Sequence, residues 1–128
     1  MTREQQQRIL VADDDEPIRQ AALTILEDEG YAVRAVADGN ELLRAYRSQA
    51  ADLVLCDLFM PGKDGLELIG ELLKEFPQAR IVAMSGGGYS GVLNVLHMAQ
   101  HLGAMAILAK PFSRTKLLDT VKAVLGAD

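Results

Sequence analysis

The sequence has little that would support disulfide bonding, nucleic-acid binding or membrane insertion. Its single cysteine, Cys56, cannot form a disulfide within the chain, and its apolar neighbours predict a small buried core side chain. The 13 basic residues against 18 acidic ones give a net charge of -5, which argues against sequence-independent binding to nucleic acid or to an anionic membrane. No apolar run approaches the roughly 18 residues of a membrane-spanning helix, and the N-terminus lacks the apolar core of a signal peptide. These absences predict a cytoplasmic protein.

The residues that are present are typical of one globular domain. The chain has 128 residues, of which 49% are hydrophobic and 24% are charged. This length is sufficient for one hydrophobic core and too short for a second domain of ordinary size. We therefore expect a single domain over residues 1–128.

Five short apolar runs alternate with five segments in which apolar residues recur at helical spacing. The runs have turn residues on both sides, as buried parallel strands do, and they cover Ile9–Ala12, Tyr31–Val36, Leu53–Cys56, Ile81–Met84 and Met105–Ala109. Helices are expected at about Pro17–Glu29, at Glu41–Ser48 after a turn at 38–40, at Leu66–Phe76, at about Ser90–Leu102, and after a cap at Ser113. Five βα units this short predict an α/β fold of the flavodoxin-like, doubly wound class, a five-stranded parallel sheet written (βα)5.

Chemically capable side chains follow four of the five predicted strands. The pair Asp13 and Asp14 follows the first strand, Asp57 the third, Ser85 the fourth and Lys110 the fifth. In an open α/β sheet, ligands bind in the crevice beyond the carboxyl ends of the strands. We therefore expect these side chains to gather at one edge of the sheet.

Such a group of side chains is suited to metal-assisted phosphoryl chemistry. Clustered carboxylates repel one another, which raises a pKa or favours a bound cation, and ligand sets made only of oxygen favour Mg²⁺. Lys110 and Ser85 would offer a positive charge and a hydroxyl donor to phosphoryl oxygens. Asp57 stands alone at a strand end and is the candidate nucleophile that would form an aspartyl phosphate. The adjacent acids Asp13 and Asp14 are instead suited to metal binding.

Three segments of the chain resemble the receiver domain of two-component response regulators, the CheY-like family. They are the acidic turn at 9–19, the segment around Asp57 at 55–65 and the closing Ala-Lys-Pro-Phe at 109–112. The resemblance covers essentially the whole chain. It implies that Asp57 is the phosphoacceptor, that Asp14 binds Mg²⁺ directly and Asp13 through water, and that the Phe59 backbone carbonyl completes the protein's metal ligands.

The resemblance also implies roles for other positions and for partners. Ser85 and Lys110 would contact the phosphoryl group, the Lys110–Pro111 bond would be cis, and Asp15 would be a solvated neighbour. The donor would be a histidine kinase or a histidine phosphotransfer protein. The recipient of the signal would be a downstream protein target or an output domain outside this sequence, reached through the face formed by the fourth strand, the helix after it and the fifth strand. Such a domain catalyses only its own phosphorylation and slow dephosphorylation, and is not an enzyme in the ordinary sense.

Three positions depart from the usual receiver pattern. Receivers commonly carry an aromatic residue three positions before the lysine, where this chain has Ile107, so the usual aromatic-coupled switch is not expected. Two residues after the acceptor and two after the serine, receivers commonly place groups that act on the hydrolytic water. Here these positions are Phe59 and Gly87, which have no hydrogen-bonding side chain. Because the Phe59 ring would also exclude water, slow loss of phosphate is predicted.

Other functions fit the sequence less well. A Mg²⁺-dependent phosphohydrolase with an Asp nucleophile normally needs a second Asp two residues later, where Phe59 stands, and a phosphorylation-independent binding module would lack the acids or the lysine. Residues 86–91 match the dinucleotide-binding pattern G-x-G-x-x-G, but they follow the fourth predicted strand instead of the first. His97 and His101 have a zinc-ligand spacing, but no third ligand is evident, which favours a solvated or core-edge pair.

Overall fold

Five parallel strands alternate with five helices in the computed structural model, which describes residues 6–60, 64–86 and 92–126, with backbone alone for 92–96. The strands are β1 (Arg8–Ala12), β2 (Ala32–Val36), β3 (Leu53–Asp57), β4 (Ile81–Ser85) and β5 (Ala106–Ala109). The helices are α1 (Glu16–Asp28), α2 (Gly39–Ser48), α3 (Gly65–Glu75), α4 (Val92–His101) and α5 (Arg114–Leu125).

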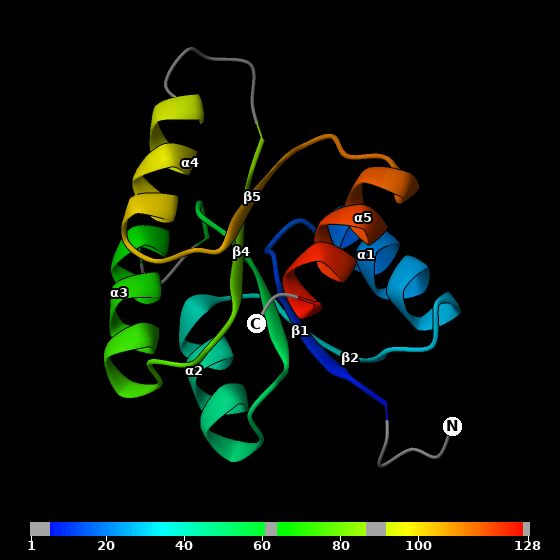
Figure 1. Cartoon of the computed structure of the whole chain (residues 1–128), viewed down its shortest axis with the longest axis horizontal. Helices are drawn as coiled ribbons and strands as arrows, with labels where there is room; N and C mark the ends of the chain where they lie inside the picture. Colours follow the sequence, from blue (N-terminus) through cyan, green and yellow to red (C-terminus); the bar gives the residue numbers. More distant parts are fainter. Residues whose placement is uncertain (1–5, 61–63, 87–91, 127–128) are drawn as a thin grey trace.

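The strands form one sheet in the order β2-β1-β3-β4-β5, with every neighbouring pair parallel. Helices α1 and α5 cover one face, and α2, α3 and α4 cover the other (Figure 1). This arrangement confirms the predicted doubly wound (βα)5 fold. Because all five strands run the same way, their carboxyl ends lie along one edge of the sheet.

The core consists of two apolar layers, one on each face of the sheet. Successive side chains of a strand point to opposite faces, so Leu10 and Ala12 of β1 join the layer under α2, α3 and α4, while Ile9 and Val11 join the layer under α1 and α5. The central strands β3 and β4 are buried along their whole length. The predicted core position of Cys56 is confirmed, and burial raises the pKa of its thiol to about 12.

Helix α2 begins earlier than predicted. The sequence indicated a turn at 38–40, but the Asp38 carboxylate accepts a hydrogen bond from the Glu41 backbone N–H at 2.8 Å and so caps a helix that already includes Gly39. The Glu41 carboxylate in turn accepts from the Ala37 N–H at 2.9 Å. The other described element ends agree with the prediction or differ from it by one residue, and the predicted start of the fourth helix, Ser90, lies outside the described residues.

Helix α3 presents a wide apolar face to the core. The apolar residues that recur at helical spacing in its sequence all pack against one core layer: Leu66, Ile69, Leu73 and Phe76. The structure fully buries Leu68, Ile69 and Leu72, whereas Leu66, Leu73 and Phe76 are only partly buried against the same layer. The reason is that α3 also packs against its neighbours α2 and α4, as in the contact between the Phe76 and Tyr46 rings at a centroid distance of 4.7 Å.

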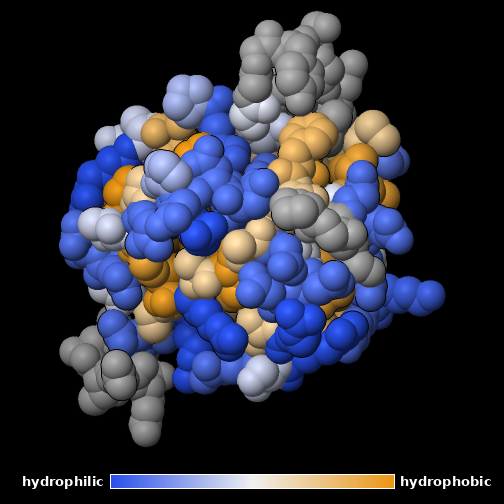
Figure 2. Space-filling model, turned by 180° about the vertical axis from the view of Figure 1, so that it is seen from behind, coloured by the Kyte–Doolittle hydropathy of each residue, from blue (hydrophilic) through white to orange (hydrophobic). Residues whose placement is uncertain are grey.

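The molecular surface is largely hydrophilic, with scattered apolar groups, on the face shown in Figure 2. Among the described residues, the large apolar side chains that remain exposed are those of Phe59, Met98, Leu102 and Met105. Within the described ranges, none of the helices has the length and apolar character needed to cross a bilayer.

Gly65 allows the segment after β3 to close against the start of α3. A Cβ atom at this position would lie 2.4 Å from the Leu58 Cα and 2.5 Å from its carbonyl oxygen, both of which are backbone atoms.

We expect Gly65→Ala to lower the free energy of unfolding by about 1–3 kcal/mol, since the backbone must shift to admit the methyl group. Urea denaturation measures this change. Gly70→Ala is the matched control, because its Cβ would meet nothing within 4 Å; it should stabilise the protein by about 0.5–1 kcal/mol. Equal stability of the parent and the Gly65→Ala variant would contradict the assigned contact.

Candidate functional site

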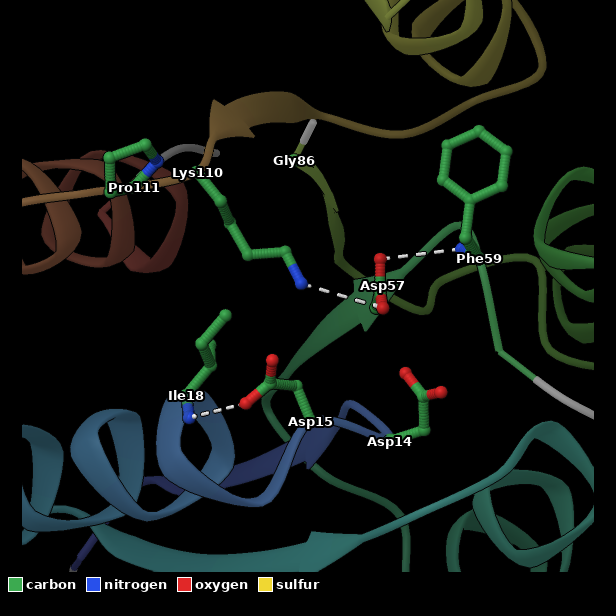
Figure 3. A pocket seen from close by; sticks show the side chains of 8 residues that line it. All are labelled: Asp14, Asp15, Ile18, Asp57, Phe59, Gly86, Lys110 and Pro111. Carbon is green, nitrogen blue, oxygen red and sulfur yellow. Dashed lines mark hydrogen bonds and ion pairs between the residues drawn. The ribbon is translucent and has the colours of Figure 1, made fainter. Parts of the chain in front are cut away.

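The carboxyl edge of the sheet carries a pocket of about 400 Å³ (Figure 3). Its lining comes from the segments that follow β1, β3, β4 and β5, and consists of Asp14, Asp15, Ile18, Asp57, Phe59, Gly86, Lys110 and Pro111. The predicted gathering of chemically capable side chains at one edge is therefore present. Asp13 and Ser85 belong to the same edge but are fully buried.

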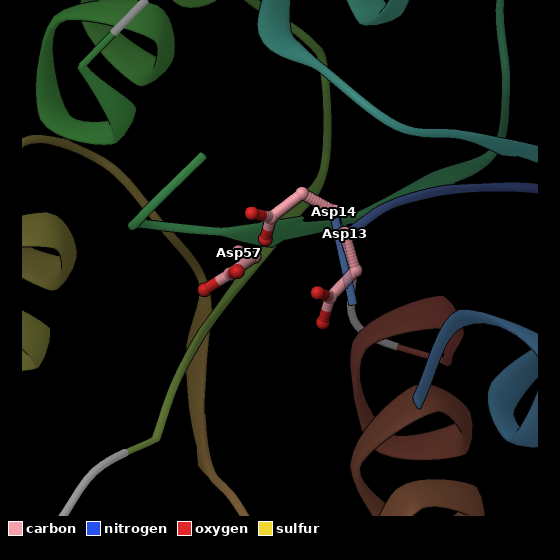
Figure 4. A group of neighbouring side chains, drawn as sticks. All are labelled: Asp13, Asp14 and Asp57. Carbon is pink, nitrogen blue, oxygen red and sulfur yellow. The ribbon is translucent and has the colours of Figure 1, made fainter. Parts of the chain in front are cut away.

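Three carboxylates converge at this pocket from two neighbouring strands. One oxygen from each of Asp13, Asp14 and Asp57 lies within 4.8 Å of the others (Figure 4). Strands β1 and β3 are adjacent and in register, with Ala12 opposite Cys56, so the acids that follow these two residues meet. Asp13 and Asp57 are buried, whereas Asp14 is exposed. The cluster therefore has a solvent-facing side at Asp14.

The two acids after β1 differ in how they are held. The Asp13 carboxylate accepts a hydrogen bond from the Asp15 backbone N–H at 2.9 Å through Oδ1 and one from the Lys110 ammonium at 2.7 Å through Oδ2. Within the described part of the chain, the Asp14 carboxylate makes no hydrogen bond or ion pair, and it lies free beside Asp57 in Figure 4. Asp14 is therefore the acid whose oxygens are available to a ligand.

Lys110 links the acids of the two strands. Its Nζ lies 2.7 Å from Asp13 Oδ2 and 3.4 Å from Asp57 Oδ2, and its side chain is 9% exposed. Burial of the ammonium acts to lower its pKa, but the hydrogen bond to Asp13 and the charge of Asp57 outweigh this effect, and the pKa is raised. Lys110 therefore stays charged. The expected cis bond between Lys110 and Pro111 is confirmed.

Asp57 has an unusually high proton affinity for an aspartate. Burial of its carboxylate, which is 4% exposed as a residue, is the largest cause, and the charge of Asp13 adds to it. The charge of Lys110 and a 3.3 Å hydrogen bond from the Phe59 backbone N–H act in the opposite direction. The net result raises the pKa of Asp57 to about 6. The carboxylate is still mostly ionised at neutral pH, which a nucleophile requires.

The raised pKa of Asp57 makes the stability of the metal-free protein depend on pH. The folded state binds this proton more tightly than the unfolded state. Below about pH 4 the group is protonated in both states and does not destabilise the fold. From pH 4 to 6 the free energy of unfolding falls, and the destabilisation is complete above pH 6. A pKa raised to this extent corresponds to an effect on the order of a few kcal/mol. We expect Asp57→Asn to stabilise the protein by about 2–3 kcal/mol at pH 7.5, and by much less at pH 4.

Urea denaturation in EDTA at both pH values measures this difference. The exposed Asp119 on α5 supplies a matched control, Asp119→Asn, whose stability should follow that of the parent at both pH values. A gain from Asp57→Asn of the same size at pH 4 and pH 7.5 would contradict the electrostatic origin of the effect.

Ser85 ends β4 with a buried hydroxyl group. Within the described residues its Oγ has no hydrogen-bond partner, although a buried polar atom without one costs about 1–3 kcal/mol. The next residue, Gly86, packs closely on the lysine, because a Cβ there would lie 3.0 Å from the Lys110 Cβ. Ser85 thus has a free donor and acceptor beside the pocket, available to a group that enters it.

Comparison with known proteins agrees with this geometry. A sequence model of the response regulator receiver domain matches residues 9–122. The chain belongs to this family. Its relatives include Protein CcdB of Bacillus subtilis (strain 168), which is 32% identical over 120 residues covering 93% of this chain and 98% of CcdB.

Solved structures resemble this receiver closely. The receiver domain of NtrX from Brucella abortus has a TM-score of 0.86 at 33% identity, covering 94% of this chain and 99% of that domain. NtrX from the same organism in complex with ADP has a TM-score of 0.88 at 33% identity over 94% of this chain. The chain spans only 27% of that NtrX chain, so the likeness concerns the receiver portion of a larger protein.

The structural roles of two residues near the acids were not predicted from the sequence. Asp15 was predicted to be a solvated neighbour; it is exposed, but its Oδ1 also accepts the Ile18 N–H at 3.2 Å and caps α1. An Asp just before Glu-Pro at a helix start is a usual capping signal, so this role was readable. Arg19 donates from Nη1 to the Asp13 backbone carbonyl at 2.9 Å. No sequence signal shows where an arginine side chain points.

The remaining sequence features lie away from the pocket. In this receiver Ile107 is partly buried against the layer under α4, in the place where an aromatic residue is common. His97 and His101 are exposed and line an open groove on α4 with Met98 and Leu102.

Among the described residues, only the Asp13, Asp14 and Asp57 group combines three potential metal ligands of the His, Cys, Asp or Glu type. Residues 87–91 of the glycine pattern lie outside the described ranges.

Proposed function

We propose that this receiver accepts a phosphoryl group on Asp57, in a Mg²⁺-dependent step, from a histidine kinase or a histidine phosphotransfer protein. The observation that supports this most is the pairing of Asp57 with Lys110 at 3.4 Å in a pocket open to solvent. The buried acid is mostly ionised at neutral pH, and a fixed cation lies beside the position that an incoming phosphoryl group would take. Residues 1–128 would act as one switch domain.

The acidic cluster fits Mg²⁺, which receiver domains typically bind at an acidic pocket. Three carboxylates face one ammonium, which leaves an excess of negative charge. The candidate ligands are all oxygens, and Asp14 is without a partner in the described structure. We assign Asp14 as the direct ligand, Asp13 as a ligand through water, and Asp57 and the Phe59 backbone carbonyl as the remaining ligands. A cation at this place neutralises charge between the carboxylates and a phosphoryl oxygen.

The transfer itself needs little from the protein beyond positioning. An oxygen of the Asp57 carboxylate forms a bond to phosphorus while the bond from phosphorus to the donor's imidazole nitrogen breaks. The donor ring carries a proton on its other nitrogen, so it leaves as a neutral histidine. Lys110 Nζ and the unpaired Ser85 Oγ would donate hydrogen bonds to the transferred group. The Ser85 hydroxyl would therefore donate its hydrogen bond only after the phosphoryl group has been transferred to Asp57.

The output would pass through the face formed by β4, α4 and β5. Ser85 ends β4, and Lys110 follows β5 directly, so a rearrangement of these two residues on phosphorylation displaces both strand ends. Ile107, which lies on β5 three residues before Lys110, has no aromatic ring, so the change would be carried by backbone and α4 movement. The recipient would be a downstream protein or an output domain, and the receiver would catalyse only its own phosphorylation and dephosphorylation.

The phosphohydrolase alternative receives no support from the pocket. Its general acid would stand at position 59, where the structure has a 47% exposed phenylalanine side chain at the pocket rim. A purely phosphorylation-independent binding module would not need the Lys110 link between Asp13 and Asp57. Both alternatives predict that no stable phosphoprotein forms.

The test is to incubate the protein with acetyl phosphate, with Mg²⁺ or with EDTA, and to measure intact mass. We expect one phosphoryl group per chain with Mg²⁺ and none with EDTA. Equal labelling in EDTA would contradict the metal assignment. Continuous release of inorganic phosphate from phosphate esters, without labelled protein, would favour the phosphohydrolase. No labelling with acetyl phosphate or with a phosphohistidine donor would favour the binding module.

A further inference from the structure

Arg19 connects the first turn of α1 to the end of β1. Its Nη1 donates a hydrogen bond to the backbone carbonyl of Asp13 at 2.9 Å, and its own backbone N–H donates to the Asp15 carbonyl at 2.9 Å. The side chain is half-buried and is the only one in the described structure that bonds to the Asp13 carbonyl. The acidic turn at 13–15 is therefore held from α1 at two backbone positions.

The bond to the Asp13 carbonyl also restrains Asp14. The carbonyl of residue 13 and the N and Cα atoms of residue 14 belong to one planar peptide unit. A donor that holds this oxygen therefore restrains the plane, and with it the position of the Asp14 Cα atom from which the side chain leaves the backbone. On the other side, the Asp13 backbone N–H donates to the Val36 carbonyl at 3.2 Å, which fixes the preceding peptide unit.

Asp14 depends on this backbone restraint more than Asp13 does. Both carboxylate oxygens of Asp13 are bound, one by the Asp15 N–H and one by Lys110, so Asp13 keeps its place through its side chain. The carboxylate of Asp14 is exposed and has no such bond within the described residues. In the described structure, the backbone is therefore the part of Asp14 that is held in place relative to Asp57.

We propose that Arg19 is a positioning residue for the metal site, which holds the Asp13–Asp14 peptide unit so that the exposed Asp14 carboxylate faces Asp57 before Mg²⁺ binds. This inference rests on the proposed function. The role of Arg19 is geometric, since in the described structure its guanidinium makes no ion pair with any of the three acids, and Lys110 is the cation that contacts them. Groups that orient metal ligands typically change metal affinity 10- to 100-fold when they are removed.

Calorimetric titration of Mg²⁺ into the parent and into Arg19 variants tests this proposal. Arg19→Leu removes the donor, and Arg19→Gln keeps a polar side chain that is too short to span the same distance. We expect both to raise the Mg²⁺ dissociation constant about tenfold or more. Arg19→Lys keeps one donor of similar reach and should fall between them and the parent. The matched control is Arg114→Leu, which removes an arginine that contacts α1 through Asp28 at 3.7 Å and Glu29 at 3.6 Å, far from the acids.

A second readout separates positioning from general damage to the fold. If Arg19 acts through Asp14, the labelling rate of Arg19→Gln with acetyl phosphate should be low at limiting Mg²⁺ and should return to within about twofold of the parent at saturating Mg²⁺. If the Arg19→Leu or Arg19→Gln protein folds and binds Mg²⁺ as tightly as the parent, the proposed role of Arg19 is wrong, but the proposed metal site is not affected. A parent protein that binds no Mg²⁺ would overturn the proposed metal site and this inference together.

Discussion

Asp57→Asn is expected to abolish phosphorylation by acetyl phosphate, with no phosphoryl group detected by intact mass under conditions that label the parent fully. The amide has nearly the same shape as the carboxylate but lacks its charge and its nucleophilic oxygen. It can still accept the hydrogen bond from the Phe59 N–H, which is 3.3 Å from Asp57 Oδ1, so the loop after β3 should keep its conformation. Loss of labelling would therefore report the chemistry of residue 57 and not a collapsed pocket.

Two further variants make this result specific. Asp119→Asn removes an exposed carboxylate on α5 and should be labelled like the parent. Lys110→Met removes the ammonium that lies 3.4 Å from Asp57 and should slow labelling by about 100-fold or more, because one preorganised charge at a reacting group is typically worth that much. Labelling of Asp57→Asn to the parent's extent would show that another group accepts the phosphate.

The fold and the edge that carries the site could be predicted because both follow from local patterns. A run such as Leu53–Cys56 of β3 is apolar throughout because both faces of the sheet are covered, and an acid that directly follows such a run must lie at the sheet edge. Parallel pairing then brings the acids after β1 and β3 together, whatever the details of the helices. Clustered acids were expected to raise a pKa or to favour a bound cation. The pKa of Asp57 is raised to about 6, but burial is the main cause and the charge of Asp13 is a smaller one.

The features that could not be predicted depend on how side chains and helices are oriented in three dimensions. Helical spacing identifies α3 but does not show how deeply each leucine is buried, because α3 also contacts α2 and α4. The different bonding of the Asp13 and Asp14 side chains arises from the direction of the Lys110 side chain, which follows β5. The unpaired hydroxyl of Ser85 is likewise a property of the space around it.

The structure alters the reasoning behind the predicted slow dephosphorylation. The sequence indicated that the Phe59 ring would shield the acceptor, but the ring is 47% exposed and extends away from Asp57 in Figure 3. The remaining cause is the absence at position 59 of a side chain that can orient a water molecule. The other position named for this role, Gly87, lies outside the described residues.

Phe59→Asn is therefore expected to accelerate the loss of phosphate about tenfold, because an amide at the pocket rim can hold a water in line with the phosphorus atom. Decay of the phosphoprotein after removal of the donor, followed by intact mass, measures the rate. Phe59→Leu is the matched control, since it shortens the apolar group without adding a hydrogen-bonding atom, and its decay should match that of the parent. Acceleration by Leu equal to that by Asn would show that the ring acts as a shield after all. A parent half-life of seconds that Asn leaves unchanged would show that another group in the pocket already positions the water.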